Sequence, residues 1–252
     1  MRQFAVAVAV ATTGILVAAC GGSNGSGTAS SSTTTTTTSS KPPLAQAALP
    51  SLLLTPGDVD SVLGVTGSKV DKTFDALQED ISAEVFPKNY KFPGDCVYIT
   101  GEALTPIYTG SGNTAMHGER DLAPIPPSSN DPNPDVTQFV VLFPSADQTN
   151  AFFNTSAQRW PACVNHQETV PSGEPDGPDI QWKTGPVSNA NGILSTVVSV
   201  TLGKGSDTIS QTCQRALTVR NNVVIDTEAC RKDPADAGIS VAKQIAGKVD
   251  KQ

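Results

Sequence analysis

The sequence predicts an α+β domain, built mainly on an antiparallel sheet with two or three packed helices and two disulfides. Three observations favour this class. Short segments with strand character alternate with turn signals over the second half of the chain, and a few segments have the apolar spacing of helices. Four cysteines form an even set in this body: Cys96, Cys163, Cys213 and Cys230. A body of about 200 residues without an internal repeat is enough for one core.

The first 19 residues have the layout of a secretory signal peptide. Arg2 supplies the basic start, and Phe4 to Ala19 is an uncharged, largely apolar run. This run is shorter than the ~20 residues that a membrane-spanning helix needs. An uncleaved signal anchor is the alternative to a removed leader.

The segment Leu16-Val17-Ala18-Ala19-Cys20 resembles the lipobox of bacterial lipoproteins. In that family the cysteine thiol receives a diacylglycerol, the leader is cut before it, and the new amine is usually acylated, for example with palmitate. The resemblance therefore implies lipidation at Cys20 and an exported protein, lipid-anchored to the cell membrane and facing the outside of the cytoplasm. Two or three acyl chains hold a protein on a membrane far more firmly than one.

Residues 20–43 are expected to form a tether between the anchor and the folded domain of residues 44–252. After Cys20, the stretch to Ser40 contains only Gly, Ser, Thr, Ala and Asn. It has no apolar face around which to fold, so it predicts a flexible linker. About 20–25 such residues reach roughly 25–30 Å on average.

A short helix is predicted at the start of the folded domain. Thr55 caps it, Pro56 fits its first turn, and Gly64 ends it. Three leucines, Leu52 to Leu54, lie just upstream and are expected to pack beneath this helix.

Three strands and a longer helix follow. The predicted strands are Cys96 to Thr100, Thr114 to Leu122 and Val136 to Phe143. Residues 121–135 hold five prolines, which predicts a long loop. In the helix after the third strand, Ser145 is the cap and Gln148 completes a capping-box pattern; Phe152, Ser156 and Trp160 share one face, and Pro161 stops the helix.

The last third of the chain predicts more strands and a final helix. A second Pro/Gly-rich loop covers Pro171 to Asp179, and Ile180 to Val187 and Ile193 to Leu202 are predicted to pair. The final helix is predicted to start at Asp233-Pro234, with an apolar face supplied by residues from Val241 to Val249.

The clearest hairpin in the sequence runs from Thr212 to Ala229. A two-residue turn at Asn221-Asn222 suits the positive φ that such turns require. That turn places Cys213 directly opposite Cys230, at a non-hydrogen-bonded position where Cα atoms lie ~4.5 Å apart, within disulfide range. The same register pairs Arg215 with Glu228 and Val219 with Val224. The two remaining cysteines, Cys96 and Cys163, are then expected to bond to each other.

These segments together resemble a known family. Phe143-Pro-Ser-Ala, Trp160-Pro-Ala-Cys163 and the run from Cys213 to Val224 are similar to the extracellular sensor domain of PknH-type mycobacterial receptor Ser/Thr kinases. The same domain occurs in mycobacterial lipoproteins without a kinase. The resemblance covers about Leu49 to Val249 and implies an α+β domain with two disulfides and a ligand-binding cleft. No kinase domain or spanning helix is recognised in this sequence, so direct signalling through its own chain is not expected.

The sequence contains no recognised catalytic or metal-binding pattern. His117 and His166 have no metal-ligand spacing with each other, and Cys163 beside His166 is expected in a disulfide. Neither a nucleophile elbow nor a phosphate-binding loop is present. We therefore expect no enzyme activity, no cofactor and no metal. The carboxylates are numerous, so a hydrolase with paired acids stays open as an alternative.

Four residues are candidates for ligand contact because each joins a large contact area to a polar end: Tyr108, Arg120, Trp160 and Arg215. The competing interpretation places Trp160 in the core and pairs Arg215 with Glu228. A cleft near the sheet is expected, bordered by the Pro-rich loop of residues 121–135 and by Pro171 to Asp179, because long loops in compact domains often bind ligands. The alternative is that both loops are solvated connectors.

The sequence thus predicts a non-catalytic cell-envelope lipoprotein that presents a ligand-binding, sensor-like domain. The expected partner is a small molecule or an envelope component, with the membrane contacted through the lipid anchor. The net charge of −7 argues against nucleic acid. The alternatives are an envelope hydrolase and an interaction module that docks on another envelope protein through an apolar patch.

Overall fold

The computed structural model describes residues 41–79, 85–125, 131–173, 177–204 and 207–252. The predicted leader, the lipidation site Cys20 and nearly all of the predicted tether lie outside these residues. Within the described part, no helix is long and apolar enough to cross a membrane.

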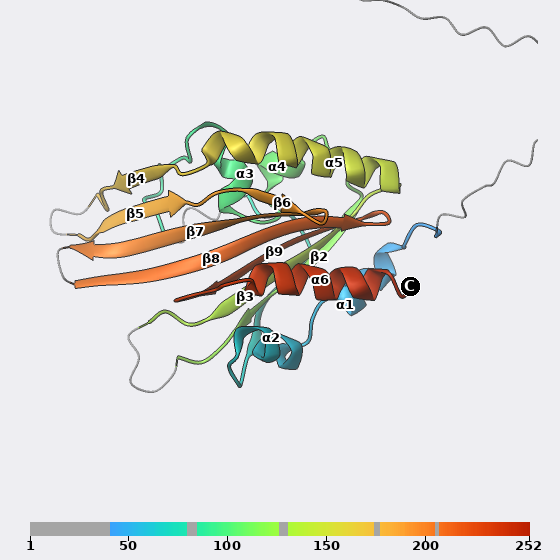
Figure 1. Ribbon diagram of the computed structural model, residues 1–252, viewed down its shortest axis with the longest axis horizontal. Helices are drawn as coiled ribbons and strands as arrows, with labels where there is room; N and C mark the ends of the chain where they lie inside the picture. Colours follow the sequence, from blue (N-terminus) through green and yellow to red (C-terminus); the bar gives the residue numbers. More distant parts are fainter. Residues whose placement is uncertain (1–40, 80–84, 126–130, 174–176, 205–206) are drawn as a thin grey trace, which may run out of the picture. The chain divides into compact units, whose positions relative to one another are not determined.

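The described strands form one sheet in which every pairing between named strands is antiparallel (Figure 1). Their order across the sheet is β1-β2-β3-β9-β8-β7-β5-β4, with the short β6 paired to β7. The strands are β1 Lys69–Phe74, β2 Ala115–Leu122, β3 Asp135–Leu142, β4 Gln167–Val170, β5 Asp179–Thr184, β6 Ser188–Ala190, β7 Ile193–Lys204, β8 Asp207–Arg220 and β9 Val223–Arg231.

Helices cover both faces of this sheet (Figure 1). One face carries η3 Gly94–Cys96, α3 Val97–Thr100, α4 Thr105–Tyr108, α5 Ala146–Arg159 and η4 Trp160–Cys163. The other carries η1 Gln46–Ala48, α1 Leu49–Leu52, α2 Pro56–Leu63 and α6 Ala237–Val249. The sheet is therefore the middle layer, and the predicted α+β class is confirmed.

We call the face of the sheet that α6 covers the closed face. An apolar core lies between this face and the helix. Val241, Ile245 and Val249 are buried on α6 and pack with Ala216 of β8 and Ile225 of β9. Helix α1 extends this layer over β2 and β3, and α2 packs against α6. The predicted position of Leu52 to Leu54 in this core is confirmed, since all three are buried.

The face covered by α3, α4 and α5 is rich in aromatic residues, and we call it the open face because a cavity lies on it. Phe152 and Trp160 pack from α5 and η4 against Phe139 of β3 and Leu217 of β8. The stripe predicted for this helix is confirmed, because Phe152, Ser156 and Trp160 are all buried. Ser145 accepts a hydrogen bond from the Gln148 amide, as an N-cap residue does.

The hairpin of β8 and β9 has the predicted register. Cys213 lies opposite Cys230, Arg215 opposite Glu228, and Val219 opposite Val224. Both predicted disulfides are present, with Cα atoms 4.9 Å apart for Cys96–Cys163 and 4.0 Å apart for Cys213–Cys230. Asn221 at the turn has φ 50°, the left-handed conformation that asparagine tolerates.

Two predictions of local structure are wrong. Residues 96–100 are not a strand: they form the end of η3 and the short helix α3, and the Thr100 hydroxyl donates to the Cys96 carbonyl. The disulfide to Cys163 holds this segment over the sheet, so tertiary contacts override its β-branched composition. The last helix begins at Ala237, because Asp233 accepts a hydrogen bond from the Ala235 amide in a turn that comes first.

The pairing predicted for the two strands after residue 179 is confirmed, with an added element. Strand β5 pairs with the second half of β7, Ile180 lying opposite Leu202. The short β6 pairs with the start of β7 through the turn at Asn191-Gly192, where both residues have positive φ. The predicted first helix is α2, where Thr55 and Asp58 form a full capping box and Gly64 is left-handed.

Candidate functional site: a cleft on the open face

A cavity of about 340 Å³ lies on the open face, and we call it the cleft. Its floor is made by side chains of β2, β3, β9, β8, β7 and β5, and one wall comes from the segment of residues 85–92. This volume is at the lower end of the range of about 300–1,000 Å³ that small-molecule sites occupy. The cleft can therefore hold a molecule of modest size.

The floor is apolar on the side of β7 and β8. Val198, Val200 and Leu202 project from alternate positions of β7, and Ile209 of β8 lies opposite Leu202. Ile209 is 50% exposed, so apolar surface reaches the mouth of the cleft. This part offers contact to an apolar ligand group without hydrogen bonds to satisfy.

Three aromatic residues line one side of the cleft: Phe86, Phe92 and Trp182. Tyr90 packs against Phe86 and Phe92, and we call the four residues together the aromatic wall. Phe86 stacks on Tyr90 with ring centroids 4.6 Å apart, and Phe92 meets Trp182 edge-on at 5.2 Å. Such pairs contribute about 0.5–1.5 kcal/mol each beyond the area that they bury. The wall thus joins an irregular segment to strand β5.

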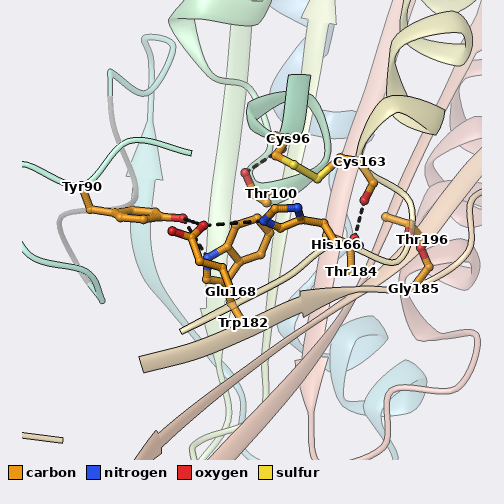
Figure 2. Close-up of a disulfide and its surroundings, with 10 residues drawn as sticks. All are labelled: Tyr90, Cys96, Thr100, Cys163, His166, Glu168, Trp182, Thr184, Gly185 and Thr196. Atoms are coloured by element: carbon orange, nitrogen blue, oxygen red, sulfur yellow. Dashed lines mark hydrogen bonds and ion pairs between the residues drawn. A yellow bond between two sulfur atoms is a disulfide. The ribbon is translucent and has the colours of Figure 1, made fainter. Parts of the chain in front are cut away.

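A hydrogen-bond chain fixes the aromatic wall (Figure 2). The Trp182 indole Nε1 donates to the Tyr90 hydroxyl at 2.8 Å, and that hydroxyl donates to Glu168 Oε2 at 2.8 Å. His166 Nε2 lies 3.6 Å from the same carboxylate oxygen, and its ring centroid is 4.8 Å from that of Trp182. Burial and the bond to Glu168 raise the pKa of Tyr90, which keeps its hydroxyl a donor.

The Cys96–Cys163 disulfide stands beside this chain (Figure 2). It joins the end of η3 to the end of η4, and the Cys163 carbonyl accepts a hydrogen bond from Thr184 of β5. The disulfide therefore links two of the segments that cover the open face, and a hydrogen bond from β5 holds one of them to the sheet.

The inner end of the cleft, beside β3 and β9, is polar. Asp135 and Thr137 of β3 and Glu228 of β9 line it, and Thr137 lies opposite Glu228. Arg120 of β2 also lines the cleft, and its Nε donates to Asp71 at 2.9 Å. The cleft therefore changes from apolar to acidic along its length.

A buried charged cluster lies on the same face under the helices. Arg215 donates to both oxygens of Asp226 at 2.8 and 2.9 Å, and the Tyr108 hydroxyl donates to the same carboxylate at 3.0 Å. The Arg215 guanidinium also stacks over Trp160, 5.3 Å from the ring centroid. A buried charge of this kind is tolerated only when it is paired and hydrogen-bonded.

Glu102, which follows α3, completes the set of buried carboxyls. It is 4% exposed, Thr137 donates to its carboxyl group, and its Oε2 has no hydrogen-bond partner. Burial raises the pKa of Glu102, and burial with the negative charge of Glu102 raises that of Glu228 well above its usual value. Burial and Glu102 likewise raise the pKa of Asp135 to about 7.

The four residues proposed from the sequence for ligand contact fall in two places. Arg120 lines the cleft. Tyr108, Trp160 and Arg215 are fully buried in the core and the charged cluster behind it. The expected ion pair of Arg215 with Glu228 is wrong: the two are opposite across the strands, but the guanidinium bonds to Asp226, which reaches it diagonally.

Two loops were expected to border a cleft. Pro132 and Asp135, from the Pro-rich residues 121–135, line this one. Residues 126–130 lie outside the described part, as do residues 174–176 of the second loop, and no described residue of Pro171 to Asp179 is among the lining residues.

Sequence reasoning missed Glu102, Asp135, Glu228 and the aromatic wall. One signal was available: the hairpin register places Glu228 on the same face as both cysteines of the second disulfide. The group Cys213, Glu228 and Cys230 has metal-like spacing, but its two sulfur atoms are bonded to each other and offer no thiolate.

Together, the fold and the cleft define a disulfide-bonded α+β domain with a partly apolar, partly acidic binding cavity. Residues 44–248 match the PknH-like extracellular domain, and the chain belongs to this family. The structural match agrees: the crystal structure of the extracellular domain of PknH from Mycobacterium tuberculosis aligns with a TM-score of 0.67 and 29% identity, covering 84% of this chain and 99% of that one.

Full-length relatives are kinases. The chain is 30% identical over 210 residues to the serine/threonine-protein kinase PknH of Mycobacterium bovis and to that of Mycobacterium tuberculosis strain CDC 1551. The match covers 83% of this chain but only 32% and 30% of those kinases. The chain thus spans about a third of the length of the curated relatives it matches.

Proposed function

We propose that this protein is a cell-envelope lipoprotein whose sensor-like domain binds a small molecule or an envelope component in the cleft, without chemical turnover. The single observation that carries the proposal is the cleft itself, an open cavity with one apolar and one acidic end. The lipobox-like segment supports the anchored location, and the relatives' extracellular domain supports the sensor-like role.

Filling the cleft tests the proposed binding. Val200 of β7 lines the cavity, so Val200→Trp places an indole where a ligand would lie. Thr201→Trp is the matched control, because its side chain projects from the opposite face of the same strand. Compounds that raise the melting temperature of the wild type and of Thr201→Trp should have no effect on Val200→Trp. Equal stabilisation of all three proteins would contradict binding in the cleft.

The anchor has its own test. Mass spectrometry of the envelope-extracted protein should find Cys20 as the first residue, carrying a diacylglycerol, and Cys20→Ala should abolish both cleavage and lipidation at that site. An unmodified Cys20 in the wild-type protein contradicts the anchor and leaves the binding proposal to its own experiment.

A hydrolase is the second candidate, because Asp135 and Glu228 both line the cleft. Glycosidases use two carboxyl groups whose environments differ, one a protonated acid and the other an ionised base or nucleophile. Here burial raises the pKa of both groups, that of Asp135 to about 7. Turnover of a glycoside that is lost in both Asp135→Asn and Glu228→Gln would favour the hydrolase instead.

A further inference from the structure

The inner end of the cleft has more carboxyl groups than cations. Glu228 and Asp135 line it, and the carboxyl of Glu102 lies behind Thr137. Among the described lining residues the one cationic side chain is Arg120, which already donates to Asp71. The nearby Arg215 is held by both oxygens of Asp226. Each of these two guanidinium groups is therefore paired with another carboxylate. Glu228, Asp135 and Glu102 are not the hydrogen-bonded partner of either one.

Glu102 is an independent sign that this end of the cleft is short of donors. Its Oε2 is buried and has no hydrogen-bond partner, although Thr137 donates to the carboxyl group. Leaving a buried acceptor unsatisfied is unfavourable, and more so when the group is charged. Thr137 lines the cleft and lies opposite Glu228, so the Glu102 carboxyl lies behind this end of the cleft without lining it.

The other end of the cleft is suited to an apolar group. Val198, Val200 and Leu202 form its floor beside the aromatic wall, and exposed Ile209 and Val85 extend the apolar surface to the mouth. The cleft therefore presents apolar side chains at one end and carboxyl groups at the other.

We propose that the cleft takes an amphipathic cation, a molecule with an apolar body and an ammonium or guanidinium head that donates to Glu228 and Asp135, the two carboxyl groups that line the cleft. This inference rests on the proposed binding function and names its ligand class. An anionic head is disfavoured although Arg215 Nη1 also lacks a partner, because the guanidinium is neutralised by Asp226 and stands among Glu102 and Glu228. An anion would have to approach those carboxyls to reach it.

The carboxyl groups of the cleft are expected to respond to a cation. Burial and the negative charge of Glu102 raise the pKa of Asp135 and Glu228, and a cation bound beside them would lower both values. The groups that act on these acids are Glu102 after α3, Asp226 of β9, Arg215 of β8, and Arg120 with Asp71 at the sheet edge.

Three matched probes test the head group: decylamine, decan-1-ol and decanoic acid, which share an alkyl chain and differ in charge. Binding to the full-length protein is measured by calorimetry below the micellar range, near neutral pH. Decylamine should bind at least about tenfold more tightly than decanol, since hydrogen bonds between charged groups are stronger than those of a neutral hydroxyl. Decanoic acid should bind more weakly than both.

A charge-removing variant locates the head group. Glu228→Gln keeps the shape of the side chain and should weaken decylamine binding about tenfold while leaving decanol binding unchanged. The matched control is Glu119→Gln, since Glu119 of β2 faces the opposite side of the sheet and does not line the cleft. Asp135→Asn is a second variant should Glu228→Gln fail to fold, and unchanged decanol binding certifies an intact cleft.

The binding pattern of the three probes supports or overturns the amphipathic-cation class. A preference for decylamine that is lost in Glu228→Gln but kept in Glu119→Gln supports the inference. Equal binding of amine and alcohol, preference for decanoic acid, or no binding of any probe overturns the amphipathic-cation class. The first two of these leave the proposed binding function standing, and the screen with Val200→Trp judges that function separately.

Discussion

The two faces of the sheet are built for different tasks. On the closed face, α6 lies along β8 and β9 and buries small and β-branched residues such as Ala216 and Ile225. On the open face, the same two strands present Arg215, Asp226 and Glu228 and a disulfide, under helices that leave a cavity uncovered. Alternate residues of one hairpin therefore serve a dry core on one side and a polar cleft on the other.

The two faces are expected to contribute differently to the free energy of unfolding. An apolar face gains free energy with every buried group, whereas buried charges at best offset their own desolvation. A domain selected for stability alone has no need of Glu102, Asp226 and Arg215 under its helices. The cost is consistent with a face kept for binding, and four changes test the comparison.

The largest effect is expected from breaking the buried ion pair. Asp226→Asn leaves Arg215 charged and without its carboxylate, and it should lower the free energy of unfolding by about 3–5 kcal/mol. Asp95→Asn is the control, because its 3.1 Å contact with Arg159 is exposed at the surface and should be worth less than about 1 kcal/mol. Urea denaturation measures both. Similar losses for the two variants would contradict the distinction between buried and surface pairs.

The second-largest effect is expected from removing the disulfides, which should differ in how much each stabilises the domain. Cys96–Cys163 closes 67 residues of sequence and Cys213–Cys230 closes 17, so loop entropy assigns them about 4 and about 3 kcal/mol. Replacing each pair by alanine and comparing denaturation midpoints and slopes checks the order. A larger loss for the Cys213–Cys230 pair would mean that its place in the cleft floor, and not loop length, decides its contribution.

Two glycines of α6 sharpen the description of the closed face. A Cβ on Gly238 would lie 2.1 Å from the Gln214 carbonyl oxygen, whereas one on Gly247 meets nothing within 4 Å. Gly238→Ala should therefore destabilise the domain by about 1–3 kcal/mol, and Gly247→Ala should stabilise it by about 0.5–1 kcal/mol. Thermal unfolding of both variants decides; a neutral Gly238→Ala would show that α6 is free to shift away from β8.

A pH dependence of stability is expected on the open face. The pKa of Asp135 is about 7 in the folded protein and about 4 when unfolded, so between these values the folded state holds more protons. Its contribution to stability therefore falls as pH rises through this window and is constant above it. Unfolding of wild type and Asp135→Asn at several pH values should give a difference that grows in favour of the variant from about pH 4 to pH 7. A difference that does not change with pH would show that the pKa of Asp135 is the same in the folded and unfolded protein.

Local sequence patterns predicted the regular parts of this fold. The hairpin register followed from one asparagine turn and two cysteines, because strand pairing has a fixed period once its turn is known. The α5 stripe of Phe152, Ser156 and Trp160 followed from helical spacing in the same way. The segment of residues 96–100 did not, since its conformation depends on a disulfide to a residue 67 positions away.

The cleft was the least predictable feature. Its lining comes from six strands and an irregular segment, and no local pattern shows that Phe86, Trp182 and Glu228 meet on one surface. Of the residues chosen for their chemistry, Arg120 reaches the cleft, while Tyr108 and Arg215 were recruited to the charged cluster behind it. Residue type indicated the polar face, but only the strand order decides which side chains line the cavity.

The most direct test of the account is to map where a bound molecule lies. Amide and indole NMR resonances of the described domain should be followed during titration with a compound that raises the melting temperature of the wild type. The account predicts saturable shifts at the Trp182 indole and at the amides of Val200, Gln211 and Glu228, with the amides of α6 unmoved. Saturable shifts along α6 with an unaffected Trp182 indole would contradict it.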